Sequence, residues 1–295
     1  MTNICAPNKF DSINSTCFTT EELIAMAKSY NLFISKSKLN PDSSKIYPNF
    51  IQIYPNFIQI KPDKKYLLME FKKRFQSVCD NELCWTKQAF MNEIVKEMLI
   101  NINTNTFRPD GPDDPTQWLN TDHINQIINQ YENLYKGFKF YGAVPSDCGD
   151  YEFCSLSKIN FNTDQIGIIF NLDKHGSGGS HWVGMFIDVN KGEIFYCDST
   201  GNPPNEGMKK IIDQFKLFYR KKTGKNPLYR VNSKKYQLDG SECGIYSCNF
   251  IIRMLKGENF DSIINNYATF EEINSCRNVY FNNGVSKYKI SSKCE

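Results

Sequence analysis

The chain has 295 residues, of which 40% are hydrophobic and 14% aromatic, enough for one large domain or two of ordinary size. Its formal net charge of +3 excludes wholesale coating of nucleic acid, although it permits a local basic patch. The N-terminus lacks the basic and apolar regions of a signal peptide, and no apolar run approaches the ~20 residues of a membrane span. We therefore expect a soluble intracellular protein.

The eleven cysteines are odd in number and irregularly spaced. In a chain of this length, in a reducing compartment, we expect most of them to be free thiols. Cys79 and Cys84 form a C-x4-C pair, and Cys148 and Cys154 a C-x5-C pair, but no two tight C-x2-C knuckles occur. These spacings argue against structural zinc, and no metal or other cofactor is expected.

Residues 1–110 are predicted to form a helical accessory domain. Apolar residues recur there at helical spacing in three segments, which are residues 19–34, 63–78 and 86–102. No catalytic constellation is visible in this half of the chain, so its helices are interpreted as packing elements.

The heptapeptide YPNFIQI occurs at 47–53 and again, without change, at 54–60. Two copies are too few for a solenoid, and the proline in each favours an edge strand or an extended loop. Further on, the Pro-, Gly- and Asp-rich segment 108–117 indicates a boundary. We expect a second domain at 111–295.

The second domain mixes helices and strands. Helices are predicted at 118–135, 206–224, 243–255 and near 270–280, and strands at 165–172, 181–189, 193–199 and 227–232. This order predicts an α+β fold with a mainly antiparallel sheet.

The strands at 181–189 and 193–199 are joined by a hairpin turn signal, Asn-Lys-Gly. A two-residue turn at 190–191 places Val183 opposite Asp198. His181 then lies on the same face as Asp198, as a diagonal neighbour at roughly 7 Å between Cα atoms. A shift of one residue in the register would put the two side chains on opposite faces.

The segment QLDGSECGIYSC, residues 237–248, contains two cysteines in different settings. Cys243 stands where a turn-like stretch passes into an amphipathic helix, and a helix N-terminus stabilises a thiolate. Cys248 lies on the apolar stripe of the same helix and is expected in the core. Position alone leaves Cys243 either a nucleophile or a small buried residue.

A thiolate nucleophile needs a base, and the chain offers three histidines. His123 lies off the apolar stripe of its helix, and His175 lies in a glycine-rich loop poorly suited to fixing a ring. His181 starts a strand and has Asp198 within reach as an orienting carboxylate. Gln237, six residues before Cys243, could supply an amide donor for an oxyanion.

The motifs HWVGMFID, FYCDS and QLDGSECG, in this order, resemble the active-site motifs of the ubiquitin-like-protein-specific cysteine proteases. This SUMO- and adenain-type family also contains the proteases of large DNA viruses. The resemblance covers about 118–255, does not extend to 1–110, and implies a papain-like or adenain-like protease core. Glu242 stands where cellular members usually carry Asp, which is closer to the viral branch.

The resemblance implies a role for each matched residue. Cys243 would be the nucleophile, His181 the general base and Asp198 the group that orients the imidazole. Gln237 and the backbone N–H of Cys243 would form the oxyanion hole. The substrate-binding residues it implies are Trp182, Trp118 and Gly244, with the two tryptophans shaping a narrow tunnel for a Gly-Gly substrate end.

We therefore expect a cysteine endopeptidase that cleaves viral structural polyproteins after small residues, at Gly-Gly-X sites, in the virion and host cytoplasm. The alternative is an isopeptidase for SUMO- or ubiquitin-like modifiers. An acetyltransferase and a catalytically inactive module that binds Gly-Gly tails are further alternatives, although the complete set of motifs argues against the last.

Residues 205–236 carry ten basic and two acidic residues, a local net charge of +8. The plainer interpretation is a solvated helix face. The functional one is a docking surface for nucleic acid or for an acidic partner.

Overall fold

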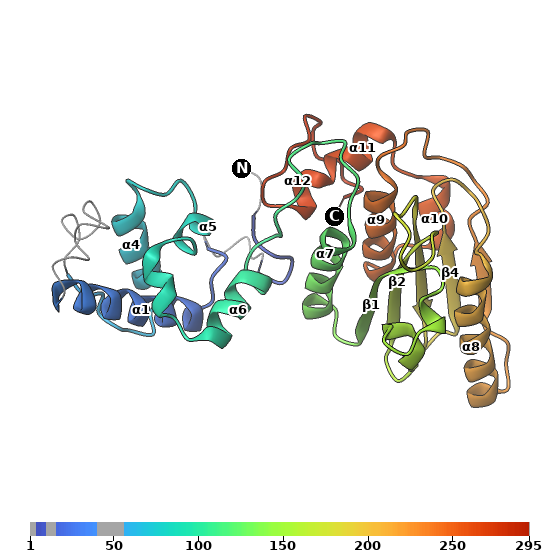
Figure 1. Ribbon diagram of the computed structural model, residues 1–295, viewed down its shortest axis with the longest axis horizontal. Coiled ribbons are helices and arrows are strands. Elements are labelled where there is room, and N and C mark those ends of the chain that lie inside the picture. Colours follow the sequence, from blue (N-terminus) through green and yellow to red (C-terminus); the bar gives the residue numbers. More distant parts are fainter. Residues whose placement is uncertain (1–3, 10–15, 40–55, 295) are drawn as a thin grey trace. The chain divides into compact units, whose positions relative to one another are not determined.

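The computed structural model describes residues 4–9, 16–39 and 56–294. The chain divides into two compact units, one up to Arg108 and the other from Pro109 onward. We call them the helical unit and the sheet unit. Figure 1 shows the elements of each.

The described part of the helical unit contains α1 (Thr20–Leu39), α4 (Lys64–Phe75), α5 (Glu82–Trp85), the 3₁₀ helix η1 (Ala89–Glu93) and α6 (Lys96–Asn105). The continuous helix predicted at 86–102 is wrong, because the backbone at Ile94 and Val95 is not helical. Two successive β-branched residues lose side-chain freedom in a helix, which favours a break there. An aromatic cluster fills the core, and it includes Phe71, Phe75 and Phe90.

The first YPNFIQI copy, at 47–53, lies outside the described residues. In the second copy, residues 56–60 form no regular strand. Ile58 is buried there, and its backbone N–H and C=O both bond to the Asn31 side chain. This stretch is an extended loop fastened to α1.

The sheet unit contains five strands and six α-helices within the described residues. The strands are β1 (Phe138–Pro145), β2 (Gln165–Asn171), β3 (Trp182–Asp188), β4 (Glu193–Cys197) and β5 (Leu228–Val231). The helices are α7 (Thr121–Leu134), α8 (Glu206–Thr223), α9 (Cys243–Leu255), α10 (Phe260–Asn265), α11 (Phe270–Ser275) and α12 (Arg277–Tyr280).

The strands form one sheet in the order β1-β2-β3-β4-β5. The pairs β2–β3 and β3–β4 are antiparallel, whereas β1–β2 and β4–β5 are parallel. The α+β class is confirmed, but the sheet is mixed rather than mainly antiparallel. The long connections explain this result, because α8 links β4 to β5, and the 3₁₀ helices η2 (Cys148–Asp150) and η3 (Ser155–Lys158) lie between β1 and β2.

Helices cover both faces of the sheet (Figure 1). On one face α7 packs on β1 and α9 on β3, while α8 contributes to the core of the opposite face. All residues of β3 are buried, as expected for a strand covered on both sides. At Gly184 a Cβ atom would meet the Phe250 ring at 2.7 Å, so glycine lets α9 lie directly on the strand.

Eight of the eleven cysteines form disulfides, so the expectation of mostly free thiols is wrong. The pairs are Cys5–Cys17, Cys79–Cys84, Cys148–Cys154 and Cys276–Cys294. Their Cα atoms are 5.0–5.6 Å apart, the separation that a disulfide requires. The C-x4-C and C-x5-C spacings are therefore disulfide spacings. Cys197, Cys243 and Cys248 remain as thiols.

Candidate active site

Cys243 is the first residue of α9, as the sequence predicts, and is buried. The turn before it is held by the Asp239 carboxylate, which accepts hydrogen bonds from the backbone N–H groups of Ser241 and Glu242 at 2.8 and 3.1 Å. The first N–H groups of a helix lack acceptors within the helix and carry partial positive charge. The Cys243 sulfur therefore lies where negative charge is stabilised.

His181 and Asp198 lie side by side at the open end of the β3–β4 hairpin. The hairpin has the predicted register, since Gly184 opposes Cys197 in the ladder. His181 immediately precedes β3 and Asp198 immediately follows β4. The imidazole Nε2 and the Asp198 Oδ1 are 2.7 Å apart, which leaves Nδ1 as the ring nitrogen for the thiol of Cys243.

The Asp198 carboxylate is fully buried and charged. Burial opposes its charge, but hydrogen bonds from His181 and from the backbone and hydroxyl of Thr200 outweigh burial and lower its pKa. The Asp-Ser-Thr-Gly turn after β4 thus supplies the donors that the buried carboxylate needs. This supporting role of Thr200 was not foreseen from the sequence, although an Asp followed by Ser, Thr and Gly is a recognisable turn signal.

His181 holds its proton more tightly than a free histidine. Burial alone would lower the pKa of the imidazole, but hydrogen bonds and charge interactions with Asp198 and Cys243 raise it to about 9. At neutral pH this favours an imidazolium beside the sulfur, the partner that a thiolate requires.

Gln237 is buried next to these residues. Its Oε1 accepts a hydrogen bond from Ser199 Oγ at 2.6 Å, and its Nε2 donates to the Asp239 carbonyl at 2.9 Å. Because a primary amide has two N–H donors, one remains for an oxyanion. The two hydrogen bonds fix the amide orientation in advance, which is the arrangement an oxyanion hole needs.

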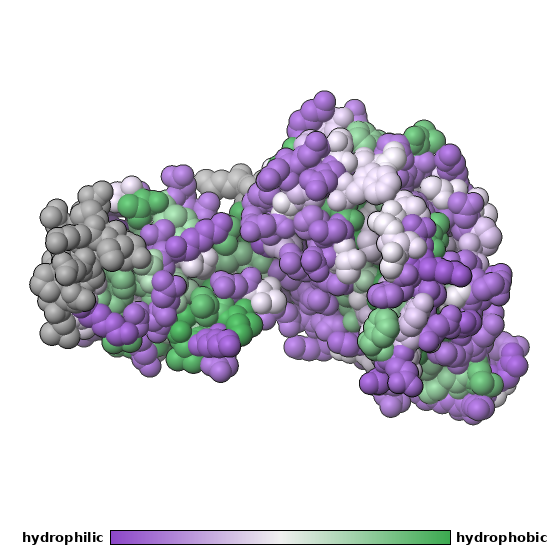
Figure 2. All heavy atoms as spheres, viewed as in Figure 1, coloured by the Kyte–Doolittle hydropathy of each residue, from purple (hydrophilic) through white to green (hydrophobic). Residues whose placement is uncertain are grey.

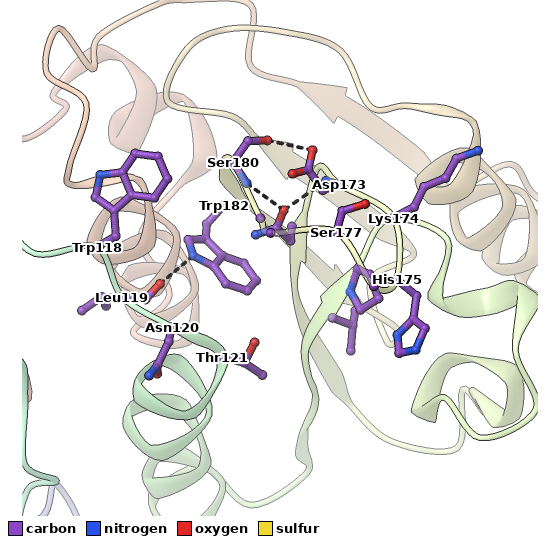
Figure 3. Close-up of a pocket in the computed structure, with 16 residues that line it drawn as sticks. Trp118, Leu119, Asn120, Thr121, Asp173, Lys174, His175, Ser177, Ser180 and Trp182 are labelled. Atoms are coloured by element: carbon purple, nitrogen blue, oxygen red, sulfur yellow. Dashed lines mark hydrogen bonds between the residues drawn. The ribbon is translucent and has the colours of Figure 1, made fainter.

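The two predicted substrate tryptophans line one cavity of about 360 Å³. Trp118 is half exposed, whereas Trp182 is buried and donates its indole N–H to the Leu119 carbonyl at 2.9 Å (Figure 3). The glycine-rich loop 174–180 forms another side of this cavity. Trp182 directly follows His181 in the chain, whereas His181, Asp198, Gln237 and Cys243 are not among the residues that line the cavity.

Gly244 is buried and is not among the residues that line this cavity. A Cβ atom at this position would meet Leu119 Cβ at 2.9 Å, so glycine allows α9 to approach the segment that carries Trp118. Its predicted contact with substrate stays a prediction.

The other two histidines have different surroundings. His123 closes a capping box with Asn120 at the start of α7. His175 lies in the glycine-rich loop against the rings of Tyr151 and Phe153.

Cys248, the second cysteine of α9, is fully buried, and burial raises its pKa far above the usual value for a thiol. Among the described residues no cluster of side chains is suited to a metal ion.

Residues 91–275 match the Ulp1 protease family, C-terminal catalytic domain. The chain is 49% identical over 300 residues to a protein of Acanthamoeba polyphaga mimivirus named as a thiol protease, covering 99% of this chain and 98% of the relative. It is 22% identical to the SUMO-1 cysteine protease of African swine fever virus, over 74% of this chain and 88% of that protein. The crystal structure of an African swine fever virus protease has the same fold, with a TM-score of 0.64 at 17% identity, covering 99% of this chain and 97% of the other.

Proposed function

Because the chain belongs to the Ulp1 protease family and is a cysteine protease similar to those of large DNA viruses, we propose that it is an endopeptidase that cleaves viral structural polyproteins at Gly-Gly-X sites. The observation that carries the proposal is the hydrogen-bonded series of Asp198, His181 and Cys243, with Trp182 of the tryptophan-lined cavity next to His181 in the chain. We place this activity in the virion and the host cytoplasm.

In the proposed reaction the Cys243 thiolate attacks the carbonyl carbon of the scissile peptide bond. The negative charge moves to the carbonyl oxygen, where the Cys243 N–H and the free N–H of Gln237 stabilise it. The carbon–nitrogen bond then breaks as the His181 imidazolium gives its proton to the departing amine, leaving a thioester. Water attacks the thioester while His181 takes up a proton, and the acid product and the thiolate are released.

The proposed specificity for glycine is supported by the two tryptophans that line the cavity. Trp118 and Trp182 present two large rigid rings, and Trp182 is fixed by its bond to Leu119. A substrate with no side chains at its last two residues can extend between such rings, whereas a larger residue would have to displace them. This favours substrates that end in Gly-Gly on the acyl side.

The test is cleavage of a Gly-Gly-X peptide beside an Ala-Ala-X peptide of otherwise equal sequence. We expect cleavage after the second glycine and, from the cost of inserting methyl groups into a tight site, roughly a 10²-fold lower kcat/KM for the alanine peptide. Failure to cleave either, together with a Cys243 that iodoacetamide does not alkylate near neutral pH, would show the proposal to be wrong.

A second function, removal of a SUMO-like modifier, is favoured by one observation: a viral relative is named as a SUMO-1 cysteine protease. A SUMO precursor and a SUMO–lysine conjugate test it. A kcat/KM for folded SUMO far above that for the short peptide would identify the modifier as the substrate. Equal kcat/KM values for folded SUMO and for the short peptide would favour polyprotein processing, because the folded SUMO domain would then contribute nothing to binding.

The basic region 205–236 is proposed to dock nucleic acid or an acidic partner. Figure 2 shows mostly hydrophilic atoms over α8, the main element of this region. Several of its cations have acidic partners, as in Lys210–Asp150 and Arg230–Asp261. Binding of a fluorescent DNA duplex that weakens steeply with salt would support nucleic acid.

None of the helices in the described residues has the length and the apolar composition that a membrane span requires.

A further inference from the structure

The residue that precedes Cys243 forms a buried ion pair. Glu242 precedes Cys243, and its side chain is fully buried together with that of Arg277, at the start of α12. Arg277 Nε donates to Glu242 Oε2, and Nη2 to Oε1, both at 3.1 Å. The carboxylate therefore points into the protein, where two N–H groups hold it in a fixed orientation.

The same guanidinium reaches the segment that carries the exposed tryptophan. Arg277 Nη2 also donates to the Gln117 carbonyl at 2.8 Å. Asn274, on α11, repeats the pattern, since its Nδ2 donates to Glu242 Oε1 at 3.0 Å and to the Pro115 carbonyl at 2.7 Å. Both side chains thus join the residue before the nucleophile to the chain before Trp118.

Residues 115–119 are consequently held from three directions. Asn274 and Arg277 hold the carbonyls of Pro115 and Gln117, Trp182 holds that of Leu119, and the space at Gly244 leaves no room for a Cβ beside the Leu119 side chain. Of these residues, Arg277 alone carries a full charge, and it bonds both to Glu242, just before α9, and to Gln117 in this segment. A buried ion pair often adds little net stability compared with apolar packing, so the hydrogen bonds of Arg277 to both Glu242 and the Gln117 carbonyl are the observations that point to a positioning role.

Charge gives a second reason for the pairing. A carboxylate one residue before the nucleophile would oppose formation of the thiolate if it were unpaired. Burial raises the pKa of the Glu242 carboxyl, whereas the charge of Arg277 and hydrogen bonds from Asn274 and Arg277 counteract burial and favour the ionised form. The geometry therefore compensates the charge of Glu242 and fixes the segment that carries Trp118.

We propose that Arg277 is a positioning residue of the active site, which locks the first turn of α9, through Glu242, to the 115–119 segment beside Trp118. The inference rests on the proposed function for its kinetic readout. It predicts that Arg277 affects both the reactivity of Cys243 and the binding of substrate, although it touches neither the substrate nor the reacting atoms.

The experiment compares Arg277→Met with Arg253→Met. Arg253 is a matched control because it lies on α9, forms a two-bond ion pair with Glu258 at 2.6 Å, and also donates to a backbone carbonyl, that of Asn266. We expect Arg277→Met to slow alkylation of Cys243 by iodoacetamide and to lower kcat/KM for the Gly-Gly-X peptide by about 10²-fold, partly through KM. Arg253→Met should lower the melting temperature with less than about a threefold change in either rate.

The double variant Glu242→Gln/Arg277→Met separates charge from geometry. It leaves no unpaired buried charge, so alkylation of Cys243 should recover while KM stays raised, because Gln117 is still released. Recovery of the wild-type KM would overturn the proposal, as would equal losses of kcat/KM in the Arg253 and Arg277 single variants at equal losses of melting temperature. If Arg277→Met does not fold, Arg277→Lys replaces it and should give the same pattern in weaker form.

The alkylation measurement also separates this proposal from the proposed function. If the wild type cleaves no peptide or SUMO substrate, the function fails. The positioning role is then judged by alkylation alone. Slower alkylation in the Arg277 variant than in the Arg253 variant would support it, and equal rates would overturn it.

Discussion

Two cysteines five residues apart on one helix have opposite environments. Cys243 lies at the start of α9 beside the His181 ring, whereas Cys248 is fully buried in the hydrophobic core and has its pKa raised by burial. The difference between the two environments follows from where the helix begins, and the turn-like residues LDGSE indicate that position in the sequence. The proposed difference in reactivity therefore rests on position along the helix rather than on residue type.

Replacing each cysteine by alanine should separate these roles. Cys243→Ala is expected to lower kcat/KM by about 10⁴-fold or more, because no other group can form the thioester. Cys248→Ala should leave activity intact and lower the free energy of unfolding by about 1–2 kcal/mol, since a small cavity is created. Peptide kinetics and urea unfolding measure both effects, and inactivity of a well-folded Cys248→Ala would contradict the assignment.

In the proposed mechanism, His181 sets the alkaline side of the pH dependence of activity. The imidazolium must donate a proton to the departing amine, and its pKa is raised to about 9. Activity is therefore expected to fall as the pH rises through about 9, when this proton is lost. Asp198→Asn removes the charge that helps to raise the pKa, so the fall should begin at lower pH. A pH–rate profile of kcat/KM measures the shift, and an unchanged alkaline limb in the variant would contradict the assigned role.

The residues of the site could largely be inferred from the sequence, and those that support it could not. The order of His181, Asp198, Gln237 and Cys243 and the hairpin spacing predicted which side chains meet. Arg277 gave no such signal, because its partners are more than thirty residues away and its burial depends on the folded tail. Long-range ion pairs leave no local pattern in a single sequence.

At the scale of elements, strong helical periodicity and capping residues predicted the positions of helices well, whereas weaker patterns did not predict every strand or how the strands pair. The helices α8 and α9 lie close to the predicted segments, and Gly224 ends α8 in the left-handed conformation as expected. Strand β1 was missed, because its apolar and polar residues follow directly on a helix with only Gly137 as a break. The parallel pairings at both edges also escaped prediction, since they depend on how long connections fold back.

Close contact between α9 and the 115–119 segment can be tested at Gly244. Because a Cβ there would press on Leu119 near its backbone, Gly244→Ala should shift the segment and raise KM for the Gly-Gly-X peptide by roughly tenfold. Gly240→Ala is the control, since no atom lies within 4 Å of its new Cβ, and KM should change less than about twofold. Equal KM values for the two variants would show that the segment does not respond to this contact.

At the scale of the whole molecule, each disulfide lies within one unit. Cys5–Cys17 and Cys79–Cys84 belong to the helical unit, and Cys148–Cys154 and Cys276–Cys294 to the sheet unit. The sequence did not predict them, because an expected reducing compartment favoured free thiols, and pairing depends on distances that only the fold creates.

The disulfide of the C-terminal tail should matter more than the shorter one. Its cysteines are 18 residues apart, against 6 for Cys148–Cys154. Chain entropy then predicts a loss of about 3 kcal/mol for Cys276→Ser/Cys294→Ser and about 2 kcal/mol for Cys148→Ser/Cys154→Ser. Urea unfolding without reductant measures both values. A reversed order would mean that local packing outweighs chain entropy.

A practical consequence follows for the choice of buffer. The proposed nucleophile Cys243 must stay in its reduced form, so a trace of dithiothreitol should protect it from oxidation and increase turnover. More of the same compound would open the four disulfides and loosen both units, the tail beside Arg277 included. Turnover plotted against dithiothreitol concentration should therefore rise, pass through a maximum and decline. The thiol–disulfide balance of the surroundings would therefore determine the turnover rate of the protein.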